Sequence, residues 1–267
     1  MNLKLDLTVQ PRLGFLNYMA RTILYIFSSF FLALFFLFDF FNKLPLVSLL
    51  KNGLITLSTV IHEVGHSIFY IFYGYVAIPS FDLQYGGGLT TAFSNQNYLL
   101  SLMVFIIFLA LSLLVKRYNK ILTISLTVLL ILLFSLTFFS YHQVVISFMG
   151  HGFEIIIGCF FLYRCVFNFS FNGTYERFLN GFFGLFLNMQ IIKYFYNVIY
   201  DSYSRLEYIN QKGGVNFGDF SVIANNLGVS LNSVCFFAII CAFLAILIPI
   251  LHYLFTQIFE AEFTKID

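Results

Sequence analysis

The sequence predicts an all-α polytopic membrane protein with six to seven transmembrane helices and a small β-hairpin or re-entrant loop after the second helix. Of its 267 residues, 60% are hydrophobic and 10% are charged, whereas a soluble domain is usually near half apolar and about a quarter charged. Apolar runs of membrane-spanning length recur along the chain. A stretch with glycines, a proline and β-favouring flanks interrupts them after the second run.

Seven apolar runs are long enough to cross a membrane, since a helix needs about 20 residues to span roughly 30 Å of hydrocarbon. A break at Pro45 separates the first two runs, and the basic stretch KRYNK follows the third. The longest polar stretch, 201–232, is expected to hold a short amphipathic helix within GDFSVIANNLGVS. We expect membrane helices at about residues 22–41, 53–77, 98–115, 121–140, 144–167, 178–200 and 234–255.

These elements divide the chain into an N-terminal tail (1–21), one transmembrane domain (22–256, including the polar loop 201–232) and a C-terminal tail (257–267). We expect an integral, multi-pass protein of the cell inner or plasma membrane, in contact with the lipid bilayer. KRYNK favours a cytoplasmic loop at that point, and the orientation of the other loops stays open. The net charge is +2 without a long basic cluster, so we expect neither a nucleic acid partner nor a nucleotide cofactor.

Two histidines and a glutamate stand inside the second apolar run, in HEVGH at 62–66. Residues four apart share a helix face, so His62 and His66 can bind one Zn²⁺ through ring nitrogens. Glu63 can reach a zinc-bound water and take its proton as general base. Ionisable groups at mid-bilayer cost about 2.5–3.5 kcal/mol each on insertion scales, and a divalent metal would compensate three of them. The motif therefore favours a zinc site over a chance arrangement of core histidines.

A second polar pair stands in the fifth apolar run, in SFMGHGFEIIIG. His151 and Glu154 are three residues apart on one helix face, at a depth similar to that of HEVGH, and Gly150 and Gly152 would allow close approach of another helix. Because catalytic zinc usually has three protein ligands, we expect His151 or Glu154 to be the third, with His151 slightly favoured. The other would support a ligand or relay a proton. The alternative is a structural pair that holds two helices together.

These motifs resemble those of the site-2 protease family of intramembrane zinc metalloproteases, in a divergent form. IHEVGHSIFYIFYGY resembles the first motif of that family, and IPSFDLQYGGGLTTAF is similar to its glycine-containing β-hairpin, so the likeness covers about residues 55–97. The resemblance implies a zinc-peptidase-like domain over 22–256. The family's second motif, Asn-Pro followed by Asp-Gly with the aspartate as third ligand, does not occur here. The acid of GDF, at 218–220, lies in a predicted polar loop, and we infer no chemistry for it.

Two further features are candidates for substrate binding. The triple glycine Gly86, Gly87 and Gly88 predicts either a flexible turn or an edge strand that holds an unwound substrate segment by backbone pairing. Asn188, in LFLNMQIIK, would be able to polarise a substrate carbonyl, although a hydrogen bond between helices is the favoured interpretation.

The sequence thus favours an intramembrane zinc metalloendopeptidase that hydrolyses peptide bonds of membrane-anchored proteins. His62, His66 and either His151 or Glu154 would hold the zinc, and Glu63 would activate the water. Two alternatives stay open: a catalytically silent relative that binds membrane segments, and a metal transporter. The intact Glu63 disfavours the first, and the gathering of polar groups at one depth disfavours the second.

Overall fold

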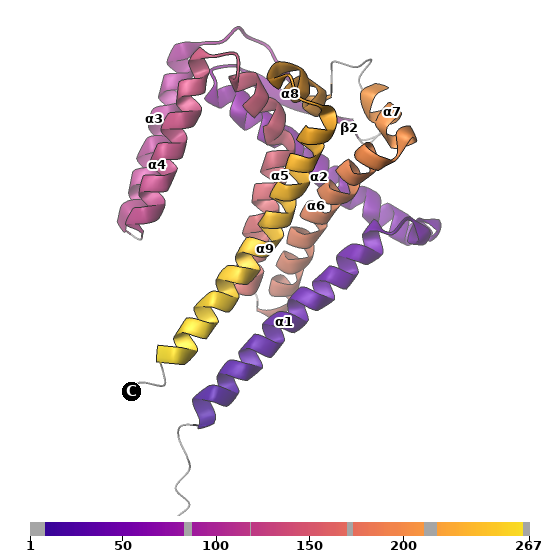
Figure 1. Ribbon diagram of the computed structural model, residues 1–267, viewed down its shortest axis with the longest axis vertical. Coiled ribbons are helices and arrows are strands. Elements are labelled where there is room, and N and C mark those ends of the chain that lie inside the picture. Colours follow the sequence, from indigo (N-terminus) through magenta and orange to yellow (C-terminus); the bar gives the residue numbers. More distant parts are fainter. Residues whose placement is uncertain (1–8, 83–86, 118, 170–172, 211–217, 264–267) are drawn as a thin grey trace, which may run out of the picture. The chain divides into compact units, whose positions relative to one another are not determined.

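Figure 1 shows the computed structural model, which describes residues 9–82, 87–117, 119–169, 173–210 and 218–263. The described chain is helical apart from one two-stranded sheet, as the sequence predicts. Three short 3₁₀ segments, Asp39–Lys43, Val115–Arg117 and Leu136–Phe138, accompany the main elements. Those elements are α1 (Val9–Leu37), α2 (Pro45–Phe72), β1 (Ala77–Asp82), β2 (Gly87–Ala92), α3 (Tyr98–Leu114), α4 (Lys120–Ser135), α5 (His142–Val166), α6 (Thr174–Tyr200), α7 (Ser202–Asn210), α8 (Asp219–Leu227) and α9 (Leu231–Phe263).

All seven expected apolar runs form helices, namely α1 to α6 and α9. Within the described residues, five segments are long and apolar enough to cross a membrane: Met19–Leu37, Pro45–Phe72, Lys120–Phe138, His142–Val166 and Leu231–Ile258. The α3 helix is apolar but has only 17 residues, and α6 carries several polar and charged side chains. Length and apolarity therefore support five crossings, where the sequence led us to expect six or seven.

The ends of two helices differ from the expected tails. The α1 helix begins at Val9 and so includes all of the described part of the predicted N-terminal tail, residues 9–21, while α9 continues to Phe263. A helix does not stop where its apolar run stops, because backbone hydrogen bonding continues into polar sequence. Asn97 and Asn119, in contrast, mark sharp starts: their side chains accept hydrogen bonds from the first backbone N–H groups of α3 and α4.

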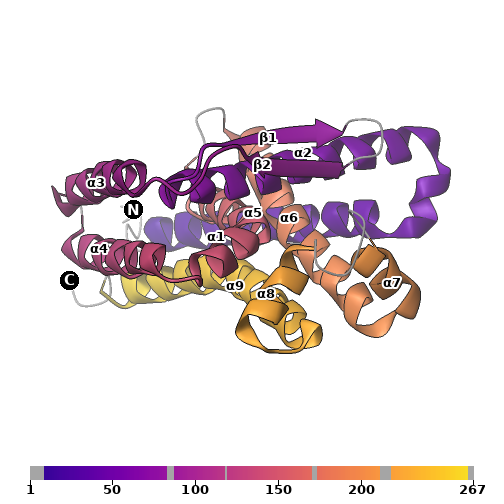
Figure 2. The same cartoon turned by 90° about the horizontal axis from the view of Figure 1, so that it is seen from above.

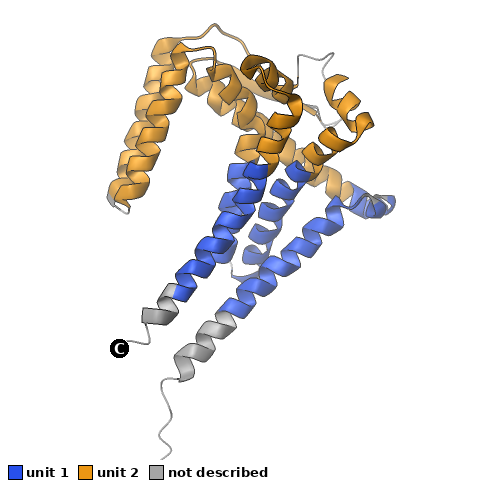
Figure 3. Ribbon diagram, viewed as in Figure 1, with its two compact units in different colours: residues 1–48, 155–192, 240–267 blue, residues 49–154, 193–239 orange. Residues whose placement is uncertain are grey.

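The chain forms two compact units (Figure 3). Unit 1 comprises residues 1–48, 155–192 and 240–267, and unit 2 comprises residues 49–154 and 193–239. The HEVGH motif, the hairpin, His151 and Glu154 all belong to unit 2.

Unit 1 is held together by a buried arginine. The Arg177 guanidinium donates to the backbone carbonyl of Cys165 at 2.6 Å and to Thr22 Oγ1 at 2.5 Å. The Tyr253 hydroxyl donates to the same Thr22 oxygen at 3.1 Å. Segments of α1, α5, α6 and α9 therefore meet at one polar cluster inside this unit.

Asn188 lies in unit 1 and its side chain is fully buried. Its Nδ2 donates to the carbonyl of Gly184 at 2.8 Å, and a Cβ on Gly158 would contact that same nitrogen. Gly158 thus gives room for Asn188 where α5 and α6 pack, which agrees with the helix-packing interpretation. Polarisation of a substrate carbonyl by Asn188 stays a prediction.

Unit 2 contains the β-hairpin that the sequence predicts. Its strands pair antiparallel, from Ala77 opposite Ala92 to Asp82 opposite Gly87, and the hairpin lies along α2 (Figure 2). Gly87 and Gly88 open β2, while Gly86 lies outside the described residues. In the same unit α3 and α4 lie side by side (Figure 1), with Phe105 and Phe134 stacked at 4.4 Å between ring centroids.

Candidate metal centre

Close packing of α2 and α5 builds the candidate site inside unit 2. A Cβ on Gly65, the glycine of HEVGH, would contact the carbonyl of Met149 and lie 2.5 Å from the Cβ of Phe153. A Cβ on Gly150 would contact ring atoms of both His62 and His66. Small residues at facing positions let two helix backbones approach, and Gly65 allows this against the carbonyl of Met149, whereas Gly150 leaves room for the two imidazole rings. A Cβ on Gly152 would instead meet side-chain atoms of Phe148 and Met149 on the same helix.

Three ligand atoms converge at this contact. The Nε2 atoms of His62 and His66 are 3.0 Å apart, and Asp219 Oδ2 lies 3.2 Å from the first and 3.3 Å from the second. Ligand atoms around a tetrahedral zinc, at about 2.0–2.1 Å from the ion, are separated by about 3.3 Å. The triangle therefore has the dimensions of three ligand atoms that share one zinc ion.

The opposite ring nitrogens have partners that select the tautomer. His66 Nδ1 lies 2.8 Å from the carbonyl of Ile146, which can only accept, so Nδ1 carries the hydrogen. His62 Nδ1 lies 3.3 Å from Glu154 Oε2. A neutral imidazole with its hydrogen on Nδ1 has a lone pair on Nε2, which is the form that binds a metal. Both histidines thus present metal-binding nitrogens to Asp219.

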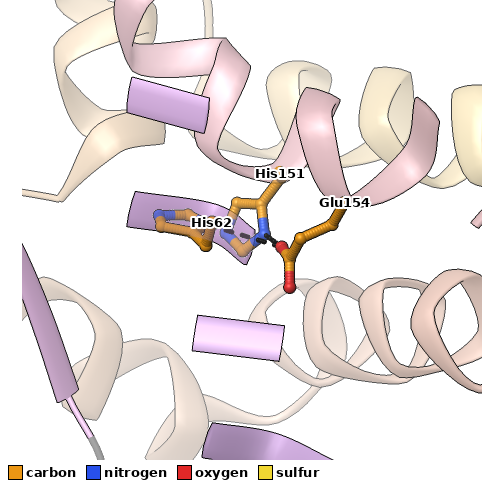
Figure 4. Close-up of side chains that lie close together, drawn as sticks. All are labelled: His62, His151 and Glu154. Atoms are coloured by element: carbon orange, nitrogen blue, oxygen red, sulfur yellow. Dashed lines mark hydrogen bonds and ion pairs between the residues drawn. The ribbon is translucent and has the colours of Figure 1, made fainter. Parts of the chain in front are cut away.

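His151 and Glu154 lie at the Nδ1 edge of the His62 ring, opposite the edge that faces Asp219 (Figure 4). His151 Nδ1 lies 2.7 Å from Glu154 Oε2, and the Ser58 hydroxyl donates to Glu154 Oε1. The sequence expectation that this pair lies next to HEVGH agrees with these contacts. His62 therefore belongs to two donor sets, one with His66 and Asp219 at Nε2 and one with His151 and Glu154 at Nδ1. Only the first set includes both histidines of HEVGH.

Asp219 was assigned no chemistry from the sequence, yet it lies against both imidazoles. It is the first residue of α8, and its neighbour Phe220 is fully buried. The Phe220 ring stacks on the Phe195 ring at 4.2 Å between centroids. The backbone N–H of Phe220 donates to the Tyr208 hydroxyl at 2.9 Å. These contacts hold the start of α8 in place. One sequence feature could have pointed to Asp219: it is an acidic residue at the start of an amphipathic segment, and Phe220, directly after it, begins the apolar face of that segment.

The charge of Asp219 suits a metal ligand. Burial alone would raise the pKa of its carboxyl group, but while Nε2 of His62 and His66 carries a hydrogen, hydrogen bonds and positive charge from the two rings hold that pKa well below the ordinary value. A cation that takes the place of those hydrogens would supply the same positive charge beside Asp219. The carboxylate is therefore ionised. Two imidazoles and one carboxylate form an ordinary ligand set for catalytic zinc.

Glu63 lies under the hairpin and is only 2% exposed. The Thr90 hydroxyl of β2 lies 2.7 Å from Glu63 Oε2 and 3.0 Å from the Glu63 carbonyl. A Cβ on Gly88 would lie 2.5 Å from Glu63 Cγ and 2.6 Å from its Oε1. Strand β2 therefore lies directly on this carboxylate, and Gly88 is required for that approach.

The described residues thus define a helical protein with five candidate membrane spans and a two-histidine, one-aspartate donor set within one compact unit. Comparisons with models of protein families, with curated proteins and with solved structures found no match.

Proposed function

We propose that this protein is an intramembrane zinc metalloendopeptidase that hydrolyses peptide bonds of membrane-anchored proteins. The observation that carries the proposal is the convergence of His62, His66 and Asp219, with Glu63 directly following His62 in the chain. The likeness of residues 55–97 to the site-2 protease family supports the same activity. The proposal includes a multi-pass location in the cell inner or plasma membrane, where lipid and the protein substrate surround the site.

In this proposal, His62, His66 and Asp219 hold the Zn²⁺. Asp219 thereby replaces His151 or Glu154 as the third ligand, because its carboxylate faces the metal-binding nitrogen of both histidines. When bound, zinc supplies a Lewis acid that activates water and polarises a peptide carbonyl.

Glu63 moves the protons of the reaction. Its carboxylate takes a proton from the water that attacks the peptide carbon, and it returns that proton to the nitrogen that leaves when the C–N bond breaks. The Thr90 hydroxyl binds one carboxylate oxygen, which fixes the orientation of the base.

The hairpin supplies a binding edge for the substrate. A transmembrane substrate helix hides its peptide groups in its own hydrogen bonds, so it must unwind locally before hydrolysis. An unwound segment adds readily to an exposed strand edge through backbone hydrogen bonds. Gly87 and Gly88 lie on the strand that contacts Glu63, so pairing at this sheet would bring a substrate peptide close to the base.

Replacing Glu63 by glutamine tests the function directly. We expect Glu63→Gln to bind one zinc per chain but to cleave about 10²–10⁴ times more slowly, because loss of a general base removes a factor of that size. The assay measures cleavage of a fluorogenic single-pass transmembrane peptide reconstituted with the protein into phosphatidylcholine vesicles. Exposed Glu207, in α7, provides the matched control Glu207→Gln, which should retain the wild-type rate.

Cleavage, zinc binding and zinc uptake, measured in the same reconstituted vesicles, separate the alternative functions. Undiminished cleavage by Glu63→Gln contradicts the role of Glu63. Zinc binding without any cleavage by the wild type supports the silent relative, and zinc uptake into vesicles that depends on His62 supports a transporter.

A glycine pair tests the contact between the hairpin and Glu63. We expect Gly88→Ala to lower the cleavage rate about 10- to 100-fold without loss of zinc, because the added methyl group must displace the Glu63 carboxylate or β2, and small displacements of catalytic groups have effects of that order. A Cβ on Gly53, in α2, meets no described atom within 4 Å, so Gly53→Ala should stay within about twofold of the wild type. Equal rates for the two variants would show that this contact has no role in catalysis.

A further inference from the structure

The cluster of Ser58, His151 and Glu154 is not used by the proposed reaction, although it contacts a metal ligand. We infer that Glu154 is a positioning residue for His62, and that Ser58 and His151 hold its carboxylate at the Nδ1 edge of that ring. The inference rests on the metal centre proposed above, and it assigns to this cluster the control of metal affinity.

The geometry of imidazole separates the two carboxylates. Glu154 lies at Nδ1 of His62 and Asp219 lies at Nε2. These two nitrogens direct their lone pair and their N–H bond to different sides of the ring. A cation bound at Nε2 therefore lies away from Glu154, which is left to accept the hydrogen of Nδ1.

This hydrogen bond affects the metal site in two ways. It keeps the hydrogen of His62 on Nδ1, and it fixes the rotation of the ring about its side-chain bonds. The 3.3 Å separation is long for such a bond. A cation at Nε2 withdraws charge from the ring and makes Nδ1–H a stronger donor, so metal binding and this contact reinforce each other.

Glu154 is itself held on both oxygens. It is 3% exposed, and a buried carboxylate is tolerated only with hydrogen-bonding partners. Ser58 donates to Oε1, and His151 lies 2.7 Å from Oε2. The His151 ring packs edge-on against Phe195 and Phe220, at 4.9 and 5.4 Å between centroids. The side chain that orients Glu154 thus packs against the same aromatic residue that anchors the start of α8.

A second cation at Nδ1 is the competing interpretation, since His62, His151 and Glu154 also place three donor atoms close together. The 2.7 Å separation of His151 Nδ1 and Glu154 Oε2 is a hydrogen-bond length and is shorter than the roughly 3.3 Å between ligands of one tetrahedral zinc. The spacing therefore favours hydrogen-bonded support over a second ion.

The test measures zinc affinity, by competition with a chromogenic chelator, in the purified full-length protein. We expect Glu154→Ala to weaken zinc binding about 10- to 100-fold and Glu154→Gln to recover part of the loss, because its amide oxygen still accepts from Nδ1. Ser58→Ala should weaken binding about threefold, by partial release of the carboxylate. All variants should still bind one zinc per chain, and Co²⁺-loaded Glu154→Ala should have an altered visible absorption spectrum. Glu207→Gln is the matched control.

The outcomes are separable. Unchanged zinc affinity and an unchanged Co²⁺ spectrum in Glu154→Ala would overturn the inference. So would a stoichiometry of two zinc ions per chain in the wild type and one per chain in Glu154→Ala. If Glu154→Ala does not fold, Glu154→Gln and Ser58→Ala decide, and wild-type affinity in both would overturn it. Failure of the proposed function looks different, because the wild type would then bind zinc without cleaving the transmembrane peptide. Failure of the proposed metal centre would appear as His62→Ala binding zinc as tightly as the wild type.

Discussion

Replacement of Asp219 by alanine is expected to weaken zinc binding by about 1,000-fold and to remove metal-dependent cleavage, the largest effect of any single side chain outside HEVGH. The variant leaves only the Nε2 atoms of His62 and His66 to hold the ion. It also removes the negative charge that lies 3.2 and 3.3 Å from those atoms. A structural zinc site with four ligands has a binding free energy of about 10–16 kcal/mol, so one ligand contributes on the order of 3 kcal/mol or more.

Asp201 provides a matched control for this experiment. Like Asp219 it stands at the start of a short helix, but it is exposed and accepts hydrogen bonds from Ser204. Asp201→Asn keeps an oxygen acceptor there and should bind zinc as the wild type does. Asp219→Asn should be intermediate, since an amide oxygen is a weaker ligand than a carboxylate. If Asp219→Ala retains full affinity while His151→Ala loses zinc, the third ligand is the one that the sequence favoured.

The sequence alone was sufficient for the parts of the site that depend on local geometry. His62 and His66 share a helix face because they are four residues apart, and the position of GHGFE within its apolar run placed His151 and Glu154 at the same depth. Long apolar runs predicted the helices for the same reason, since hydrophobicity over 20 residues is a strong signal. The limits of α1 were less predictable, because helical backbone extends beyond the apolar residues.

Residue spacing could not predict which edge of the His62 ring faces Glu154 and which faces Asp219. This orientation depends on side-chain rotation and on the packing of Gly65 and Gly150, which only the tertiary structure specifies. Asp219 was missed for a related reason: it lies 153 residues beyond His66, in a segment with little hydrophobicity. Asp219 is held at the site by the burial of Phe220 against Phe195. This is a tertiary contact between α6 and α8, and residue spacing along the sequence does not predict it.

The second large effect is expected from a single methyl group. Gly150→Ala should prevent zinc binding at micromolar zinc, because a Cβ there would contact His66 Nε2 and lie 2.5 Å from both Cε1 and Nε2 of His62. Neither ring can rotate away without losing its partner at Nδ1, the carbonyl of Ile146 for His66 and Glu154 for His62. A retreat of α5 from the rings would also open its close contact with Gly65, at Met149 and Phe153.

Gly53→Ala, on α2 like the HEVGH motif, separates this steric effect from helix propensity. A Cβ on Gly53 meets no described atom within 4 Å, so this control should bind zinc normally and gain up to about 1 kcal/mol of helix stability. Thermal unfolding of both variants without zinc shows whether they fold, and chelator competition then gives their zinc affinities. A folded Gly150→Ala protein with wild-type affinity would contradict the arrangement of the two Nε2 atoms against α5. The reason is that the added methyl group would lie within 2.5 Å of ring atoms of both histidines, so the two rings could not keep these positions.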